Sequence, residues 1–420
     1  MKKIFIMTGE LSGDRLAAWY VHRLRAADPS VQIHAVGGDF LEQEGVTIVE
    51  RFESLNVVGV TEIISHLPHI LRSLQRIATY IMEQQFDEVI LVDFPGFNLR
   101  LARLLTRSRV KAAGTKPSAV APLELPPSLK LWRTGWRDAA SPASPKPPKG
   151  VGGKPVGRRR ATITYLSPPQ LWVWGAWRVR SLKQCCNKVI VMYPFEVAWY
   201  ARCGVTAIWI GNPVYDQVVG YRTAVKTVEP RIALIPGSRR SEIERLLPLF
   251  LSVAVQVHKL YPAVRFVLPI ARSITVDQLE ALVKRHRLQA IWQQVDLVRE
   301  EDEKHKALAH CAMAISKPGT VTLELALLRV PTVVVFKISW VTYLLARPLV
   351  RVKHMALPNL LLKKSVFPEL IQYGCTPERV AQVALAWYEH ALRQDGVYAA
   401  VLADCDRLAT LLAGVDKTNI

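Results

Sequence analysis

The sequence has few of the features that mark secreted, metal-binding or membrane-spanning proteins. Its six cysteines are scattered, without a Cys-x-x-Cys pair or a zinc-finger spacing, which predicts reduced thiols in a cytoplasmic protein. The first apolar run is ended by Gly9 and Glu10, too soon for the core of a signal peptide. The longest apolar tract, Val330–Val350, contains Lys337, Arg347 and two prolines, so it does not predict a spanning helix.

Acidic residues are also scarce, because 55 Lys and Arg residues stand against 35 Asp and Glu residues. The net charge of +20 favours an anionic partner, which could be nucleic acid, anionic lipid or a phosphorylated substrate. More than half of the excess lies in residues 107–161, which hold thirteen basic residues, two acidic ones and nine of the 27 prolines. This composition cannot build a core, so we expect a disordered basic insert. A basic nucleic-acid-binding protein is the least favoured interpretation, because no recognised nucleic-acid module is visible.

The rest of the chain is typical of an α/β protein. Short apolar runs alternate with helical patterns in each half, which predicts two Rossmann-like domains in the GT-B arrangement, with a cleft between them. We expect an N-terminal domain of residues 1–215, a C-terminal domain of residues 216–374, and closing helices in residues 375–420 that pack back on the N-terminal domain. Nucleotide-sugar glycosyltransferases and a few epimerases share this fold, so the fold alone does not decide the function.

One joint between a strand and a helix organises the second half. Ile232–Ile235 is a continuous apolar run of the kind that forms a strand buried on both faces, and Gly237 follows its end. We expect the next helix to be capped by Ser238 or by Ser241, the latter with Glu244 at the capping-box spacing. Such a joint presents unpaired N–H groups at a helix N-terminus, where an anion is favoured.

Two basic residues and a second joint indicate which anion. Arg239 and Arg240 adjoin the first helix N-terminus and favour a phosphorylated ligand, although two solvated arginines on an ordinary turn are the alternative. In the second joint, Gly319 and Thr320 precede a helix that carries Glu324 about one turn in. This spacing allows Thr320 to meet phosphate while Glu324 accepts from ribose hydroxyls; a polar helix start is the alternative.

Polar residues also follow two strands of the first half. The turn Thr8–Asp14 follows the first strand and leads into a helix expected to begin at Arg15, and Asp93 follows the apolar strand Glu88–Val92. Carboxylates at the carboxyl ends of parallel strands point into the crevice where open α/β sheets bind ligands. The alternative for Asp93 is that it only accepts hydrogen bonds from the next turn.

An apolar stretch, Leu55–Leu71, has two interpretations. Its apolar residues crowd a segment that also carries basic side chains, so it could be an interfacial surface that meets lipid. The alternative is a buried helix with a bent start. The residues expected to contact membrane or acyl chains are Val57, Val58, Ile63 and Leu67.

Eight short motifs, in order along the chain, resemble those of lipid-A-disaccharide synthases. They are Gly9-Glu10-x-Ser12-Gly13-Asp14, Asp93-x-Pro95-x-Phe97-Asn98, Ser167-Pro168-x-x-Trp172-x-Trp174, Pro194-Phe195-Glu196, Pro236-Gly237-Ser238-Arg239, Gly319-Thr320-x-x-Leu323-Glu324, Pro358-Asn359 and Pro368-Glu369-Leu370-x-Gln372. The resemblance covers nearly the whole chain apart from the insert. Two further departures are Asn212, where the family usually has His, and Lys317-Pro318, which enlarges the usual Ser-Gly-Thr turn.

The resemblance implies an inverting, metal-independent glycosyltransferase that needs no cofactor. It would join UDP-2,3-diacylglucosamine to 2,3-diacylglucosamine 1-phosphate, forming the β-1,6-linked lipid A disaccharide 1-phosphate and UDP in lipopolysaccharide biosynthesis. It also implies a cytoplasmic enzyme held peripherally at the anionic inner face of the inner membrane, without a nucleic-acid partner and with a homodimer left open. A UDP-sugar 2-epimerase on the same fold is the alternative enzyme.

The resemblance also assigns roles to individual residues. Asp93 is the expected general base on the acceptor hydroxyl, Glu10 is the competing base, and Arg239 is expected to stabilise the departing UDP. No residue is expected to bind metal. The residues expected to bind substrate or UDP are Gly9, Ser12, Gly13, Asn98, Gly237, Ser238, Gly319, Thr320, Glu324, Asn359 and Gln372.

Overall fold

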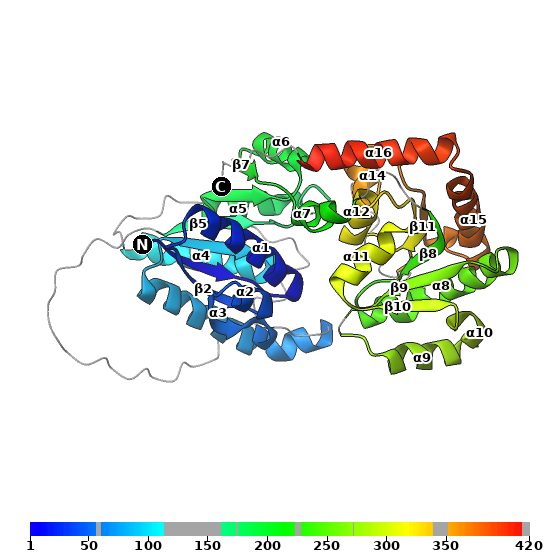
Figure 1. Ribbon diagram of the computed structural model, residues 1–420. Helices are drawn as coiled ribbons and strands as arrows, with labels where there is room; N and C mark the ends of the chain where they lie inside the picture. Colours follow the sequence, from blue (N-terminus) through cyan, green and yellow to red (C-terminus); the bar gives the residue numbers. More distant parts are fainter. Residues whose placement is uncertain are drawn as a thin grey trace. The chain divides into compact units, whose positions relative to one another are not determined.

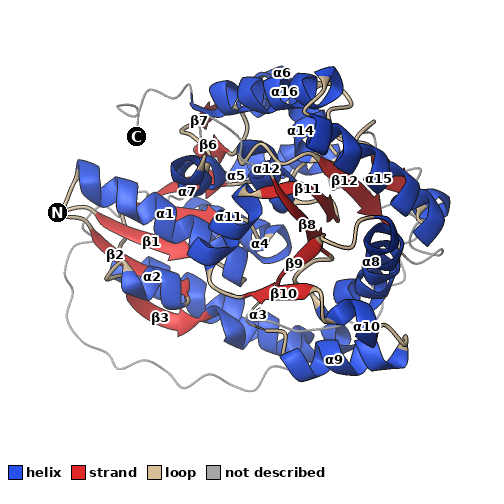
Figure 2. Ribbon diagram, turned by 45° about the vertical axis from the view of Figure 1, so that its right-hand side comes forward, coloured by secondary structure: helices blue, strands red, loops and turns tan. Residues whose placement is uncertain are grey.

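The computed structural model describes the backbone of residues 1–55, 60–112, 161–173, 175–222, 228–271, 273–338 and 352–413. Its strands form two sheets, and every strand pair with a described register is parallel. Figure 1 follows the chain by colour, and Figure 2 shows helices beside the strands of each sheet. The predicted α/β class with two Rossmann-like sheets is confirmed.

The first sheet has the strand order β3-β2-β1-β4-β5-β6-β7, which reverses between β1 and β4. Its central strands are apolar throughout, as burial on both faces requires. The strands are β1 (Lys3–Met7), β2 (Gln32–Gly37), β3 (Thr47–Arg51), β4 (Glu88–Val92), β5 (Thr162–Leu166), β6 (Lys188–Val191) and β7 (Ala207–Trp209). The helices between and after them are α1 (Leu11–Ala27), α2 (Asp39–Gln43), α3 (Val60–Gln84), α4 (Pro95–Ala112), α5 (Val179–Cys185), α6 (Pro194–Arg202) and α7 (Pro213–Val218).

The second sheet repeats this plan in the order β10-β9-β8-β11-β12-β13, with its reversal between β8 and β11. Its strands are β8 (Glu229–Ile235), β9 (Arg265–Pro269), β10 (Val295–Val298), β11 (Cys311–Ser316), β12 (Thr332–Phe336) and β13 (Glu369–Ile371). Its helices are α8 (Arg240–Leu260), α9 (Val276–Arg285), α10 (Gln289–Trp292), α11 (Glu301–Ala309), α12 (Thr320–Leu327), α14 (Leu357–Leu362), α15 (Pro377–Arg393) and α16 (Gly396–Ala413).

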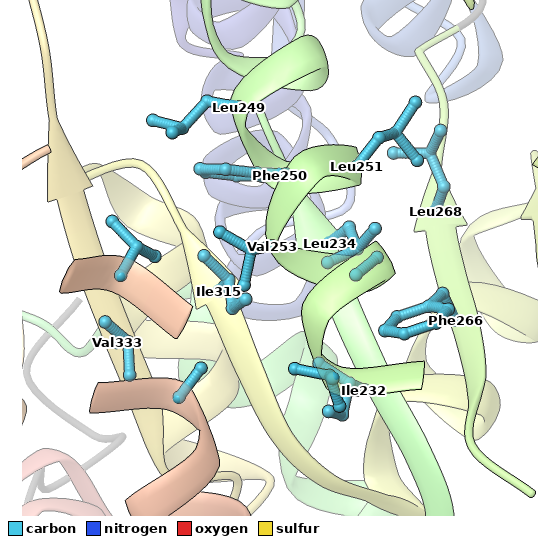
Figure 3. Packing of buried hydrophobic residues seen from close by; sticks show 14 of the residues in the cluster. Ile232, Leu234, Leu249, Phe250, Leu251, Val253, Phe266, Leu268, Ile315 and Val333 are labelled. Carbon is cyan, nitrogen blue, oxygen red and sulfur yellow. The ribbon is translucent and has the colours of Figure 1, made fainter. Parts of the chain in front are cut away.

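The core of the second sheet lies under α8. Ile232 and Leu234 of β8, Phe250 and Val253 of α8, and Phe266 of β9 are fully buried together (Figure 3). At roughly 25 cal/mol per Å² of apolar surface, each such side chain stabilises the fold by about 2 kcal/mol. The strand and helix of this joint are therefore fixed by apolar packing, which leaves the loop between them to present its polar groups.

The expected domain boundaries stay a prediction, and three features of the structure bear on them. One compact unit contains Met1–Asp14, Ser30–Thr164 and Cys185–Asn187, and the second contains Arg15–Pro29, Tyr165–Gln184 and Lys188–Ile420. Helix α15 packs its apolar face into the core of the second sheet, and α16 contacts α7. Helix α4 continues to Ala112, past the expected start of the insert, and residues 113–160 lie outside the described chain.

Candidate functional site

In the N-terminal half of the chain, the candidate functional residues lie where the strand order of the first sheet reverses. Strands β1 and β4 pair in parallel with Met7 opposite Leu91, so they end at the same edge of the sheet. The turn after β1 carries Glu10, and the residue after β4 is Asp93. Open α/β sheets bind their ligands outside the carboxyl ends of strands at such a reversal.

Asp93 occupies an unusual turn. Its φ is +45° and that of Phe94 is +44°, a left-handed conformation that side chains other than glycine adopt only when their surroundings hold them there. The side-chain amide of Asn98 donates to the carbonyls of Val92, at 3.0 Å, and Asp93, at 2.8 Å. Burial and the nearby charge of Glu10 raise the pKa of Asp93 to about 6. Asp93 is therefore a carboxylate of raised basicity at the expected position.

The glycine-rich turn after β1 packs against this strained turn. A Cβ on Gly9 would lie 2.2 Å from the Phe94 ring, so only glycine fits there. Helix α1 begins at Leu11 rather than at Arg15, and Ser12 in its first turn donates to Glu10 Oε1 at 2.8 Å. The fold thus brings the Gly9–Ser12 turn and the Asp93 turn together, as the sequence predicts.

Asn98 and Gly13, two residues predicted to bind substrate, also lie near this edge of the first sheet. Asn98 is fully buried, and its amide nitrogen supports the Asp93 turn, while its contact with substrate stays a prediction. A Cβ on Gly13 would make only ordinary contacts, at 3.7 Å from Thr8, so close packing does not explain this glycine. A buried residue that the sequence interpretation missed is Asp14, which accepts from Gly38 N at 2.7 Å.

In the C-terminal half of the chain, the candidate functional residues lie at the reversal of the second sheet. Ile235 at the end of β8 pairs with Ser316 at the end of β11, so the loops 236–239 and 317–319 leave the sheet side by side. Gly237 has a φ of +129°, which favours glycine. Ser238 and Arg239 are exposed at the start of α8, where an anion could reach them.

The cap of α8 differs from the expectation. Neither Ser238 nor Ser241 caps the helix; Arg239 is the N-cap residue, and Glu242 accepts from the N–H groups of Ser238, at 3.2 Å, and Arg239, at 3.3 Å. Glu244 pairs with Arg240 instead. The physical reason is that the helix begins at Arg240, which places Glu242 rather than Glu244 at the third helical position.

Glu242 is a site residue that the sequence interpretation missed. Lys317 Nζ donates to Glu242 Oε1 at 2.8 Å, and this bond and charge outweigh burial, so the pKa of Glu242 is lowered. Both residues line a pocket of about 110 Å³ with Arg245 and Lys337. The Glu242 carboxylate therefore accepts hydrogen bonds from the first N–H groups of α8, and a pocket with basic side chains lies beside it. The signal available in the sequence was the glutamate three positions after Arg239.

The second loop of this half carries the predicted ribose contact. Gly319 has a φ of +147°, a Cβ there would meet open space, and Thr320 is exposed as the first residue of α12. One turn later, Glu324 Oε2 accepts from Lys304 Nζ of α11 at 2.9 Å. Although burial disfavours the ionised form, His305 and Lys304 lower the pKa of Glu324 to about 2. Glu324 is therefore a permanently ionised acceptor.

Two other residues predicted to bind substrate or UDP are buried and hydrogen-bonded within the fold, and their ligand contacts stay predictions. Asn359 is fully buried, donates to Phe367 O and Glu369 Oε1, and accepts from two N–H groups, so its amide is used within the fold. Gln372 is 7% exposed and pairs with the backbone of Ile338, accepting at 2.7 Å and donating at 3.2 Å. Both side chains hold loops in place.

Asn212 stands where the resemblance leads one to expect histidine. Its side chain accepts from Val214 N at 2.9 Å and donates to Met192 O at 3.0 Å, and it is 3% exposed. Asn212 is thus the buried N-cap of α7, a role for which asparagine is well suited.

The residues expected to contact the membrane are described by their backbone at most. Val57 and Val58 lie outside the described residues, as do the side chains of Ile63 and Leu67, whose backbone belongs to α3. Among the described helices, none combines the length and the apolar character needed to cross a bilayer.

Comparison with known proteins shows to which family the chain belongs. A model of the family described as lipid-A-disaccharide synthetase matches residues 4–114 and 154–400, and the gap between these ranges falls inside the basic insert. A lipid-A-disaccharide synthase from Nitrosococcus oceani is 31% identical over 394 residues, 91% of this chain and 86% of the relative. One from Myxococcus xanthus is 30% identical over 402 residues, 94% of this chain and 90% of the relative.

Solved structures confirm the fold. The UDP-GlcNAc 2-epimerase from Neisseria meningitidis, bound to UDP-GlcNAc, matches with a TM-score of 0.54 over 98% of this chain and 100% of its own, at 10% identity. That from Methanocaldococcus jannaschii matches with a TM-score of 0.52 over 99% and 100%, at 9% identity. Likeness at such low identity concerns the fold only, whereas the match to the family model and the relatives at about 30% identity show the family. The chain therefore belongs to the lipid-A-disaccharide synthase family.

Proposed function

We propose that this protein transfers a 2,3-diacylglucosamine unit from UDP to 2,3-diacylglucosamine 1-phosphate, with inversion and a β-1,6 linkage. The observation that carries the proposal is the family match across both halves of the candidate site. The two halves also differ in the chemistry that such a transfer needs. The first holds a basic carboxylate, Asp93, and the second holds cationic groups and helix N-termini suited to a diphosphate.

In the proposed step, the acceptor hydroxyl oxygen attacks the anomeric carbon of the donor sugar. The bond from that carbon to the phosphate oxygen of UDP breaks at the same time, and UDP leaves. The hydroxyl proton passes to Asp93, with Glu10 as the competing base. With a pKa of about 6, Asp93 is mostly ionised at neutral pH yet more basic than an ordinary aspartate. Arg239 and the positive end of the α8 dipole would stabilise the charge that builds on UDP.

An assay of UDP release tests the proposal. UDP should form from UDP-2,3-diacylglucosamine only when the acceptor lipid is also present, with one disaccharide formed for each UDP. Conversion of UDP-N-acetylglucosamine alone to its 2-epimer would instead identify the epimerase. Release of UDP at the same rate without acceptor would also contradict the proposed transfer.

We further propose peripheral attachment to an anionic membrane surface, because both proposed substrates carry acyl chains and the net charge is +20. Residues 57–71 are the proposed contact. The fraction of protein that sediments with anionic vesicles should fall steeply as the salt concentration rises. At low salt, neutral vesicles should bind less protein than anionic vesicles do. Equal binding to both kinds of vesicle would contradict an electrostatic attachment.

A further inference from the structure

A compact cluster of charged side chains lies beneath the N-terminal part of α12. Lys304 Nζ is 2.9 Å from Glu324 Oε2 and 2.7 Å from Glu301 Oε2. His305 Nε2 lies 3.5 Å from the same oxygen of Glu324. The side chains of Lys304, His305 and Glu324 are exposed by only 17%, 6% and 16%. The carboxylates of Glu324 and Glu301 stabilise the charge of this largely buried lysine, because an unpaired buried ammonium group costs free energy.

The contacts on Glu324 are one-sided. Lys304 and His305 both approach Oε2, and the described part of the chain supplies no donor to Oε1. A carboxylate anchored by one oxygen keeps the lone pairs of the other available, and its rotamer is fixed. Glu324 also follows Thr320 and the open Gly319 turn, at the ligand-binding edge of the sheet.

We infer that Lys304 is a positioning residue for donor recognition: it anchors Glu324 Oε2 so that Oε1 accepts hydrogen bonds from the ribose hydroxyls of UDP. This inference rests on the proposed function and extends it to a residue on α11 that touches no substrate itself. Without Lys304, Glu324 would lose the ammonium group that fixes its rotamer and would be repelled by the half-exposed carboxylate of Glu301. Removal of an acceptor that pairs with a ribose hydroxyl costs about tenfold or more in affinity.

Comparison of UDP with 2′-deoxy-UDP by calorimetry tests the inference. The wild type should bind 2′-deoxy-UDP about tenfold more weakly than UDP. In Lys304→Met, UDP affinity should fall to near that of the deoxy compound, so the ratio of the two dissociation constants approaches one. Lys304→Arg should restore part of the discrimination, because it keeps the charge. Lys306→Met, at an exposed lysine of the same helix, is the matched control and should behave as wild type.

The outcomes separate the inference from the proposed function. If Lys304→Met and Lys304→Arg both keep the wild-type discrimination, the positioning role is wrong while the donor site stands. If the wild type binds neither nucleotide, the proposed function itself fails. Should Lys304→Met melt far below wild type, Lys304→Arg and Glu301→Gln carry the test. A donor KM that rises in Lys304→Met without a change in the acceptor KM would support the inference independently.

Discussion

Replacement of Asp93 by Asn should uncouple activity from stability. The change keeps the shape of the side chain but removes its ability to take a proton. If Asp93 is the general base, turnover should fall by about 10²-fold or more while UDP binding is retained. Glu10→Gln is the matched variant, because it neutralises the other carboxylate of the same site.

The same substitution should stabilise the fold at neutral pH. A folded pKa of about 6 against the ordinary 3.8 corresponds to roughly 3 kcal/mol, at 1.36 kcal/mol per pH unit. Because the folded pKa is raised, the stability linked to Asp93 is fully present below about pH 4 and is lost as the pH rises through about 6. Asp93→Asn should therefore melt at a higher temperature than wild type at pH 7.5, and the difference should shrink at pH 4.

Two measurements check this reasoning. Differential scanning fluorimetry at several pH values gives the stability difference, and the pH profile of kcat/KM should have an acidic limb near pH 6, with a rate at pH 5 roughly tenfold below the plateau. Glu10→Gln should move this limb to lower pH, since the charge of Glu10 helps to raise the pKa. A folded Asp93→Asn that keeps most activity would refute the assignment and transfer it to Glu10. An Asp93→Asn that melts lower at neutral pH would indicate that Asp93 mainly accepts structural hydrogen bonds.

Arg239→Ala should lower kcat more than it weakens UDP binding, because its charge matters most as the phosphate leaves; unchanged single-turnover rates would contradict this. Glu324→Ala should weaken UDP binding by about tenfold or more in calorimetry, and unaltered affinity would exclude the ribose contact. Replacing residues 115–153, which the family model does not match, by a short Gly/Ser linker should leave the melting temperature nearly unchanged, since their composition cannot form a core; a large loss would show that they pack. Leu67→Asp should raise the apparent KM for lipid substrates without loss of the fold, whereas aggregation would place Leu67 in the core.

The sequence by itself determined the positions of the candidate site. Apolar runs such as Ile232–Ile235 must be buried in a parallel sheet, and the polar turn after each of them must then lie at the carboxyl edge. This local rule was enough to predict that Glu10, Asp93 and the turns at Gly237 and Gly319 follow the carboxyl ends of strands, whereas the strand order itself placed β1 beside β4 and β8 beside β11.

Only the tertiary structure decided the state of these residues. The raised pKa of Asp93 depends on burial by several elements and on Glu10 across the sheet edge, neither of which follows from neighbours in sequence. Likewise, Lys317 reaches Glu242, and Lys304 reaches Glu324, from separate elements. Burial and charge add up over everything packed around a group. A motif therefore reveals where a polar side chain lies, while its protonation and its remaining hydrogen-bonding capacity depend on partners that folding brings from elsewhere in the chain.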